Sequence, residues 1–430
     1  MTSMSLLPKI NGADNGRGFG GREAASSLGM VAADGRLAPE AAAVTTWSGF
    51  SRRRSAGEQV LTNARIVGRE FAFTGTVHVM GGRIVALDDG RSHVRSAVDF
   101  EGDLLLPGFV DVHTDNLERH LEPRPGVAWP GLAALIAHDR QMLAAGITTV
   151  LDSLCVGDQQ RGCARRPGLL PETLEALRRA EADGLLRAQH FLHLRCEVSS
   201  DEVVPTFAAM ADDPRLRLVS LMDHTPGQRQ WADLAAWRRR YRDLSEEQLA
   251  TIRTRRSAAP PGVAERGEIA QLCRQRGLTL ASHDDTTADH IAEARALGVT
   301  VSEFPTTAEA ARAARAAGMR VVMGAPNIVL GGSHSGNVSA REVLAAGLVD
   351  GLASDYVPTS LLQACFLLHE LLGLGLPAAV AAVSAKPAAM LGLDDRGEIS
   401  PGRRADMLRV RMCGSLPVVG AVWREGVLLG

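Results

Sequence analysis

The sequence predicts an α/β protein, a (β/α)8 TIM-like barrel with a small β-sandwich domain formed from both terminal segments. First, eight short apolar runs alternate with helical stretches rich in Ala and Arg between residues 105 and 395. Such alternation implies parallel strands joined by helical crossovers, and eight units suggest a closed barrel. Second, runs typical of strands flank this region at both ends. A doubly wound sheet is the alternative, but no G-x-G-x-x-G motif opens the first unit.

Four segments follow one another along the chain. Residues 1–57 are rich in Gly, Ala, Ser and Arg, which predicts a disordered or poorly packed extension. Residues 58–104 hold short alternating runs broken by Gly and Asp, which are typical of strands and hairpins. Residues 105–395 form the predicted barrel, and residues 396–430 supply the second part of the β-domain.

The eight apolar runs of the barrel each end in polar residues. They cover 108–115, 147–153, 190–198, 216–224, 278–285, 299–305, 320–327 and 350–356. The fourth unit carries a polar insertion at 229–262, which we expect to form helices and a loop over one end of the barrel. Two consecutive units resemble each other in sequence, TTADHIAEARALGVTV and TTAEAARAARAAGMRVV.

Composition excludes several classes of function. The formal net charge of −2 gives no bulk attraction to nucleic acid or to an anionic membrane, and aromatic residues make up only 4% of the chain. The six cysteines contain no C-x-x-C pair, which favours reduced thiols over a disulfide framework. No apolar run reaches the roughly 18 residues that span a bilayer, and the N-terminus has no secretory signal. We therefore expect a cytoplasmic protein without a nucleic-acid or membrane partner.

Six residues at the ends of the predicted strands have side chains that bind metals. In a barrel, catalytic groups gather at the C-terminal ends of the strands. Three histidines and three carboxylates suit a binuclear site for divalent ions, most simply zinc or else manganese. Each residue alone could be a satisfied polar group, a helix cap or an ion-pair partner, and it is the joint pattern that indicates a metal site. The predicted ligands are His113, Asp115, Glu197, His224, His283 and Asp355.

Longer motifs carry a resemblance to a known family. DLLLPGFVDVHTD and GEISPGRRAD resemble the first strand and the C-terminal β-segment of the amidohydrolase superfamily of metal-dependent hydrolases. HTDNLERHLEPRPGV, LHLRCEVSS, DHTPGQRQ, SHDDTT and GAPNIVLGGSHSGN are similar to the PhnM family, the diphosphatases of bacterial phosphonate degradation. The resemblance implies α-D-ribose 1-methylphosphonate 5-triphosphate as the substrate, with the 5-phosphate and pyrophosphate as products. It also implies a pathway link to carbon–phosphorus lyase proteins.

The resemblance assigns roles to individual residues. Most superfamily members have H-x-H on the first strand, whereas this chain has His113 and Asp115. Many members bridge their two metals with a carboxylated lysine, but lysine occurs here only at Lys9 and Lys386, which leaves Glu197 as the implied bridge. Asp355 on the eighth strand is implied to orient the attacking water and to accept its proton.

Two loops offer donors that would suit a triphosphate. Arginine forks bind phosphate oxygens in a bidentate manner, and Gly-rich turns can form anion-binding nests. The alternatives are salt bridges from the arginines to Glu118 and Glu122, and an ordinary flexible loop at 327–337. The expected substrate-binding residues are Arg119, His120, Arg124, Arg195, Asn327, Gly331, Gly332, Ser333, His334 and Asn337.

These expectations predict a hydrolase acting on a phosphoanhydride bond. Water activated by two metals would attack the α-phosphorus, and pyrophosphate would leave. The alternative is an amidohydrolase that cleaves a cyclic amide or an N-acetyl group, which would need the metals but not the arginines. A third possibility is a non-catalytic barrel, but none of the six ligand positions is degraded. A homo-oligomer is compatible with the sequence, which does not decide it.

Overall fold

A computed structural model describes most of the chain after residue 56. The described residues are 57–124, 126–157, 169–231, 233–240, 245–247, 249–250, 254, 262–333 and 335–430. Apart from Gly57, the predicted extension at 1–57 lies outside them, as do His334 and much of the predicted insertion at 229–262.

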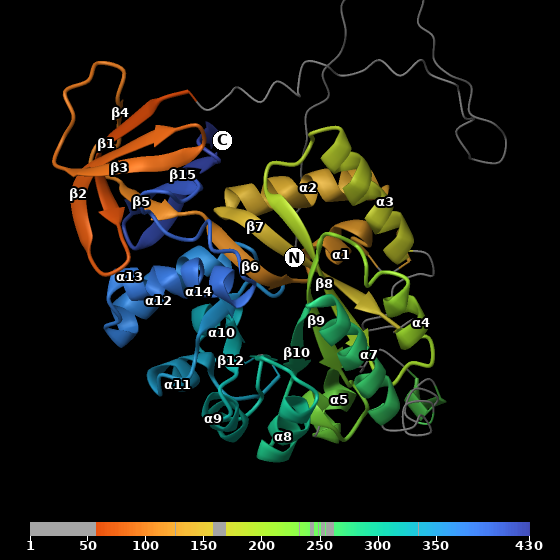
Figure 1. The fold of residues 1–430 in the computed structure, drawn as a ribbon. Coiled ribbons are helices and arrows are strands. Elements are labelled where there is room, and N and C mark those ends of the chain that lie inside the picture. Colours follow the sequence, from red (N-terminus) through yellow and green to blue (C-terminus); the bar gives the residue numbers. More distant parts are fainter. Residues whose placement is uncertain are drawn as a thin grey trace, which may run out of the picture. The chain divides into compact units, whose positions relative to one another are not determined.

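Eight parallel strands form the predicted barrel, in which each strand pairs with the next along the chain. An isolated bridge between Thr114 and Asp355 joins the last strand to the first and completes the circle. The barrel prediction is therefore confirmed (Figure 1). The strands are β6 (Phe109–Thr114), β7 (Ile147–Val156), β8 (Gln189–Glu197), β9 (Leu216–Met222), β10 (Thr279–His283), β11 (Val301–Glu303), β12 (Arg320–Gly324) and β13 (Gly351–Ala353).

Helices connect the barrel strands and pack outside them (Figure 1). A large apolar core joins strands and helices, including Leu135 of α2 and Leu361 of α12. The helices of the described residues are α1 (Asn116–Leu121), α2 (Gly131–Ala144), α3 (Leu169–Ala182), α4 (Val203–Ala208), α5 (Leu234–Arg240), α7 (Val263–Arg276), α8 (Ala288–Ala296), α9 (Ala308–Ala316), α10 (Ala325–Leu330), α11 (Ala340–Ala345), α12 (Ser360–Leu372), α13 (Leu376–Ala381), α14 (Ala385–Met390) and the 3-10 turn η1 (Arg229–Trp231).

The two units with similar sequences also have similar structures. Helix α8 begins after Thr287, whose side chain accepts a hydrogen bond from the backbone N–H of His290. Helix α9 begins after Thr307, whose side chain accepts from the backbone N–H of Ala310. Threonine at this position satisfies a backbone donor that the first turn of a helix leaves unpaired. The repeat therefore places equivalent residues at equivalent positions around the barrel.

The terminal segments build one further sheet. Its order is β16-β15-β14-β5-β1-β2-β3, with β4 also paired to β1, so the strands expected as a sandwich form one continuous mixed sheet. Antiparallel pairing of β5 with β14 joins the two ends of the chain. Leu61, Phe100 and Trp423 belong to its separate core. The strands are β1 (Gln59–Val67), β2 (Ala72–Met80), β3 (Arg83–Asp89), β4 (Val98–Asp99), β5 (Leu104–Pro107), β14 (Met407–Cys413), β15 (Leu416–Arg424) and β16 (Val427–Leu428).

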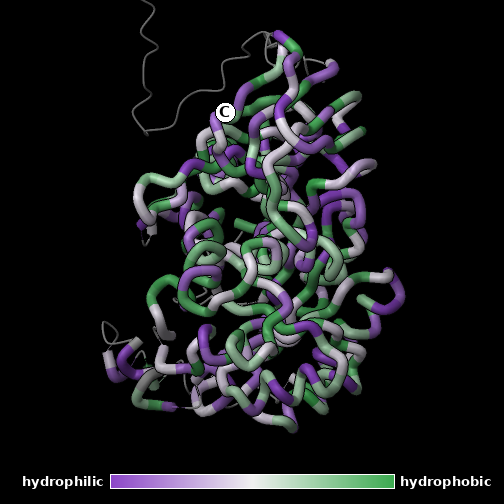
Figure 2. The backbone as a smooth tube through the Cα atoms, turned by 90° about the vertical axis from the view of Figure 1, so that its left-hand side faces the viewer, coloured by the Kyte–Doolittle hydropathy of each residue, from purple (hydrophilic) through white to green (hydrophobic). Residues whose placement is uncertain are grey.

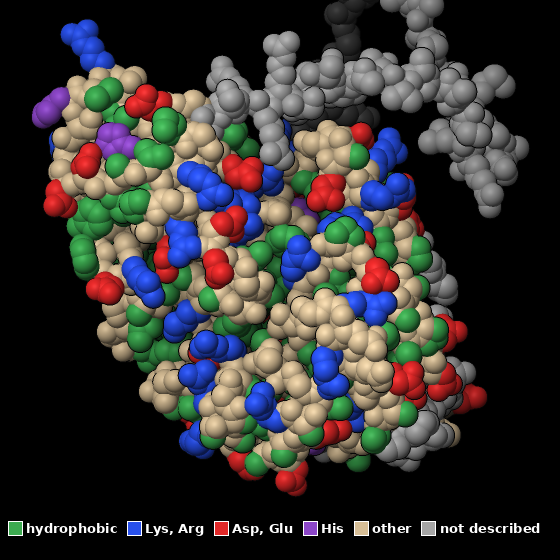
Figure 3. Space-filling model, in the orientation of Figure 1, with side chains coloured by type: hydrophobic (Ala, Val, Ile, Leu, Met, Phe, Trp, Pro, Cys, Tyr) green, Lys and Arg blue, Asp and Glu red, His purple; other side chains and the backbone are tan. Residues whose placement is uncertain are grey.

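The domain limits at residues 57, 104 and 395 stay predictions. Apolar and hydrophilic stretches alternate along the coloured part of the tube in Figure 2, and none of the helices described is long and apolar enough to cross a membrane. On the face drawn in Figure 3, basic and acidic side chains are interspersed, in keeping with the small net charge.

Candidate active site

The interior of the barrel contains an apolar layer with a polar layer next to it. The apolar cluster takes one buried residue from each strand: Val112, Leu151, Phe191, Leu218, Ala281, Val301, Val322 and Ala353. Side chains two positions apart on a strand point to the same side. The residues two positions further along include His193, Ser220, His283, Glu303 and Asp355. Strand alternation therefore brings polar side chains from many strands together at the C-terminal end of the barrel.

The first strand departs from strict alternation. Val112 belongs to the apolar interior cluster, yet its neighbour His113 also contacts an interior side chain, Glu303. The pairing of β6 with β7 shifts register between Asp111 and Thr114. A register shift of this kind changes the direction in which side chains point, which explains why two consecutive residues can both face the interior.

Three predicted ligands meet where the barrel closes. His113, Asp115 and Asp355 offer ligand atoms that all lie within 4.8 Å of one another. Backbone bonds hold them together, because Asp115 N–H donates to the carbonyl of Asp355 (2.7 Å) and Asp355 N–H donates to that of His113 (3.0 Å). His113 Nε2 lies 3.4 Å from Asp115 Oδ1.

A second group contains two more predicted ligands and one residue that was not predicted. His224, His283 and Asp284 offer ligand atoms within 4.8 Å of one another. Asp284 Oδ2 lies 3.6 Å from His283 Nε2 and 4.0 Å from His224 Nε2. This oxygen is buried and has no hydrogen-bond partner among the described residues. Its position directly after His283 at a strand end was the signal that could have identified it.

Glu197, the implied bridge, contacts the second group. Its Oε2 lies 2.7 Å from His224 Nδ1, and its Oε1 accepts from the backbone N–H of His224 (3.1 Å) and from Ser199 Oγ (2.6 Å). These contacts fix the orientation of the His224 imidazole. A bridging role for Glu197 stays a prediction.

Glu303 and His193 form a third cluster with His113, and neither was among the predicted site residues. Glu303 Oε1 lies 3.2 Å from His113 Nδ1, and its Oε2 lies 3.4 Å from His283 Nδ1 and 3.6 Å from His193 Nε2. The internal repeat could have identified Glu303, because SHDDTT and SEFPTT stand at equivalent positions and align His283 with Glu303. The two residues also pair in register on neighbouring strands.

The backbone at three strand ends adopts an unusual conformation. Asp284, Phe304 and Asp355 have φ angles of 57°, 53° and 56°. Non-glycine residues rarely occupy this left-handed region, and such strain clusters at functional sites. All three line the same cavity, so the strained residues and the candidate ligands coincide.

Buried charge makes the cluster electrostatically suited to cations. Burial opposes protonation of His113, but Glu303 and Asp115 raise its pKa to about 10. Burial, together with the negative charge of Asp115, raises the pKa of Asp355 to about 7. Burial likewise raises the pKa of Asp284. Divalent cations would stabilise carboxylates that lie close together and out of water, and mixed imidazole and carboxylate donors suit them. The residues present therefore fit a divalent metal site.

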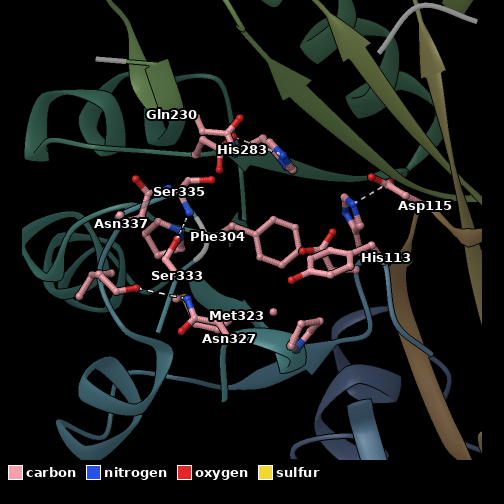
Figure 4. Close-up of a pocket in the computed structure, with 18 of the residues that line it drawn as sticks. His113, Asp115, Gln230, His283, Phe304, Met323, Asn327, Ser333, Ser335 and Asn337 are labelled. Atoms are coloured by element: carbon pink, nitrogen blue, oxygen red, sulfur yellow. Dashed lines mark hydrogen bonds and ion pairs between the residues drawn. The ribbon is translucent and has the colours of Figure 1, made fainter. Parts of the chain in front are cut away.

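A cavity of about 600 Å³ connects these groups to a polar loop. His113 and Asp115 lie on one side of it in Figure 4, Ser333, Ser335 and Asn337 lie on the opposite side, and Phe304 projects between them. The insertion after the fourth strand also contributes Gln230, Trp231 and Arg239 to the lining.

The predicted substrate-binding residues fall into three sets. Arg195, Asn327, Gly332, Ser333 and Asn337 line the cavity, whereas Arg119, His120, Arg124 and Gly331 are not among its lining residues. His334 lies outside the described residues. Ser335 of the loop at 327–337 also lines the cavity, as do Gln230 and Arg239, which lie within the insertion expected over the barrel end but were not predicted as site residues.

Helix geometry explains the placement of the first-strand loop. Glu118 is buried and pairs with Arg195 Nη2 at 3.1 Å. Successive residues of a helix are turned by about 100°, so Arg119 points away from that contact, and it donates to the carbonyl of Tyr356 (2.9 Å). His120 Nε2 lies 2.9 Å from Gln141 Oε1, and Arg124 is exposed.

Arg195 contacts the metal-ligand cluster directly. Besides Glu118, its guanidinium contacts Asp115 Oδ1 at 3.1 Å. The residue is only 4% exposed. Arg195 thus offsets part of the negative charge around Asp115, and it still lines the cavity.

Comparison with known proteins identifies the family. No family model matches the chain. It is 43% identical over 380 residues to the α-D-ribose 1-methylphosphonate 5-triphosphate diphosphatase of Escherichia coli strain K12, covering 85% of this chain and 99% of that protein.

Solved structures share the fold at low sequence identity. The 5-methylcytosine deaminase of Klebsiella pneumoniae has a TM-score of 0.60 at 15% identity, covering 86% of this chain and 98% of that one. The N-acetyl-D-glucosamine-6-phosphate deacetylase of Mycobacterium smegmatis has a TM-score of 0.58 at 18% identity, covering 86% and 100%. From its identity to the Escherichia coli protein and its amidohydrolase fold, the chain belongs to the α-D-ribose 1-methylphosphonate 5-triphosphate diphosphatase (PhnM) family of hydrolases.

Proposed function

We propose that this protein hydrolyses α-D-ribose 1-methylphosphonate 5-triphosphate to the 5-phosphate and pyrophosphate with two divalent ions, zinc in the first instance and manganese as the alternative. The observation that carries the proposal is the cavity that joins two groups of metal-binding side chains to a loop rich in Gly, Ser and Asn. The 43% identity to the Escherichia coli diphosphatase supports the choice of substrate.

The two groups would each hold one ion. His113, Asp115 and Asp355 would bind the first, and His224, His283 and Asp284 the second. Glu197 is our proposed bridge, in keeping with its contact to His224. When bound, such ions activate water for attack and neutralise charge on phosphate oxygens.

The residues of the chain itself would position the substrate and move the proton. Asp355 is the proposed proton acceptor, because its carboxylate belongs to the first group and lines the cavity. Holding the phosphates in line with the attacking water would supply much of the remaining rate enhancement.

The opposite side of the cavity would hold the pyrophosphate portion. Backbone N–H groups near Gly332 and the side chains of Ser333 and Asn337 line it, and such groups bind phosphate oxygens. Arg239 would add a cation from α5, where its guanidinium now contacts Asp233 at 3.6 Å. Arg119 and Arg124 remain candidates for a weaker interaction with the substrate phosphates from outside the cavity, since neither residue lines it.

The same proposal extends to the biological setting. Turnover of a phosphonate ester would place the protein in phosphonate degradation, with the predicted link to carbon–phosphorus lyase proteins. The fold alone would also accommodate cleavage of a cyclic amide or an N-acetyl group, as the deacetylase likeness illustrates. A pocket lined by Arg239 and by a Gly-rich loop, together with the metal-binding side chains, favours the phosphorylated substrate.

A product assay with a matched pair of variants tests the proposal. Metal-loaded protein should release pyrophosphate from the triphosphate in equal amount to the 5-phosphate. Arg239→Ala should raise KM about tenfold or more, because a charge-assisted phosphate contact contributes roughly 1.5–3 kcal/mol. Arg238→Ala should leave KM unchanged, since Arg238 on the same helix pairs with exposed Glu246 and does not line the cavity. Release of orthophosphate alone, or hydrolysis of amides only, would refute the proposed reaction.

A further inference from the structure

We propose that Glu303 is a positioning residue shared by the two metal groups, and that it fixes the orientation of one histidine in each. The inference rests on the proposed function, which supplies the two metal ions. Glu303 ends β11, the strand next to β10, which carries His283, and it is fully buried. A positioning role makes three demands on Glu303. Its carboxylate must contact His113 and His283, it must do so at the ring nitrogen that does not face the ion, and it must itself be held in place.

Each oxygen of Glu303 faces a different histidine. Oε1 lies 3.2 Å from Nδ1 of His113, which belongs to the first group. Oε2 lies 3.4 Å from Nδ1 of His283, which belongs to the second group. The two imidazoles stack beside the carboxylate, with ring centroids 5.6 Å apart and planes inclined by 20°. One carboxylate can therefore accept an N–H from both rings at once.

The opposite ring nitrogens face the proposed ion positions. His113 Nε2 lies 3.4 Å from Asp115 Oδ1, and His283 Nε2 lies 3.6 Å from the buried Asp284 Oδ2. A metal-binding histidine commonly donates its other N–H to a carboxylate, which fixes the tautomer and raises the basicity of the ligand. Here one carboxylate would perform this function for both ions, which links their binding.

Further hydrogen bonds hold Glu303 in place. Ser220 Oγ donates to Glu303 Oε2. His193 Nε2 lies 2.5 Å from Ser220 Oγ, and His193 Nδ1 lies 3.1 Å from Ser153 Oγ. The chain of contacts crosses from β7 through β8 and β9 to β11, with every member buried. A carboxylate restrained in this way loses little freedom when it orients the two imidazoles.

Glu303 could instead be a metal ligand itself, because it forms a potential ligand group with His113 and His193. The two roles predict different metal binding. A ligand that is removed takes away a donor atom from one ion and lowers the number of donors around it. Removal of a positioning residue leaves the donor atoms in place and lowers the affinity for both ions together.

The experiment compares zinc binding by wild type, Glu303→Gln and Glu197→Gln, by competition with a chromophoric chelator and by X-ray absorption of the loaded proteins. The amide of Glu303→Gln is neutral and offers one acceptor oxygen, so neither imidazole keeps a charged partner at its Nδ1. We expect two ions per chain at saturation, affinities for both lowered about 10–100-fold, and an unchanged number of donors around zinc. Glu197→Gln, which alters the proposed bridge, should lower the donor number.

Two results would overturn the inference: unchanged affinity for both ions in Glu303→Gln, or loss of one ion with the other unaffected. Ser220→Ala provides a second variant if Glu303→Gln does not fold, because it frees the carboxylate without touching a ligand. Ser220→Ala should lower the affinity for both ions by a smaller factor than Glu303→Gln does. Unchanged affinities in Ser220→Ala would equally count against the inference. Zinc binding is measured without substrate. Failure of pyrophosphate release would therefore refute the proposed function, whereas the role of Glu303 is decided by the zinc affinities alone.

Discussion

A buried histidine outside the active site should make stability depend on pH. His190 of β8 places Nδ1 2.8 Å from Asp152 Oδ2 and Nε2 3.2 Å from Asp139 Oδ1. Asp152 also accepts from His138 Nε2 at 2.7 Å. All four side chains are buried and together they join α2, β7 and β8. The perturbation is His190→Gln, which retains polar contacts but removes the titrating group.

The pKa of His190 sets the size of the pH-dependent contribution to the free energy of unfolding. Burial lowers it, but the negative charges of Asp152 and Asp139 prevail and raise it from 6.5 to about 9. At about 1.4 kcal/mol per pKa unit, protonation of His190 contributes on the order of 3 kcal/mol to the free energy of unfolding. Because the pKa is raised in the folded state, this stabilisation is fully present below pH 6.5 and is lost as the pH rises through 9.

Urea unfolding of wild type and His190→Gln between pH 6 and pH 10 tests this expectation. The stability difference between the two proteins should shrink by about 3 kcal/mol across that range. His78→Gln is the matched control, because His78 lies 2.8 Å from Asp88 in an exposed pair. An exposed pair contributes under about 1 kcal/mol at any pH. A wild-type advantage over His190→Gln that stays constant from pH 6 to pH 10 would show that His190 is neutral in the folded protein and refute the reasoning.

Three further predictions concern the metals, the proton acceptor and the helix caps. Dialysis against a chelator should reduce pyrophosphate release to background, with recovery on adding zinc or manganese; full activity in verified metal-free protein would contradict the metal site. Asp355→Asn should lower kcat by about 100-fold or more at saturating metal, as expected for loss of a general base, and near-normal pyrophosphate release would reassign that role. Thr287→Ala and Thr307→Ala should each reduce the free energy of unfolding by about 1 kcal/mol, measured in urea; a clear effect at only one position would show that the repeated caps are not equivalent.

The sequence by itself determined the barrel and most of the candidate ligands. Apolar runs that end in polar residues predict parallel strands whose C-terminal ends meet at one face. This local pattern was sufficient to select His113, Asp115, His224, His283 and Asp355, all of which line one cavity. The resemblance of long motifs to the PhnM family added the reaction, and the comparison with the Escherichia coli protein supports it.

The tertiary structure decided which polar side chains share the site. Glu303 stands in an apolar run, and its contact with His283 arises only when β10 and β11 pair in register. Arg119 follows the first strand closely, yet the turn of α1 directs Glu118 inward and Arg119 outward. Arg239 lies far from the strand ends in sequence, and only the folding of the insertion brings it to the cavity. Strand ends are fixed by local periodicity, whereas the direction of each side chain depends on register and helix rotation, which are set by contacts between residues distant in the chain.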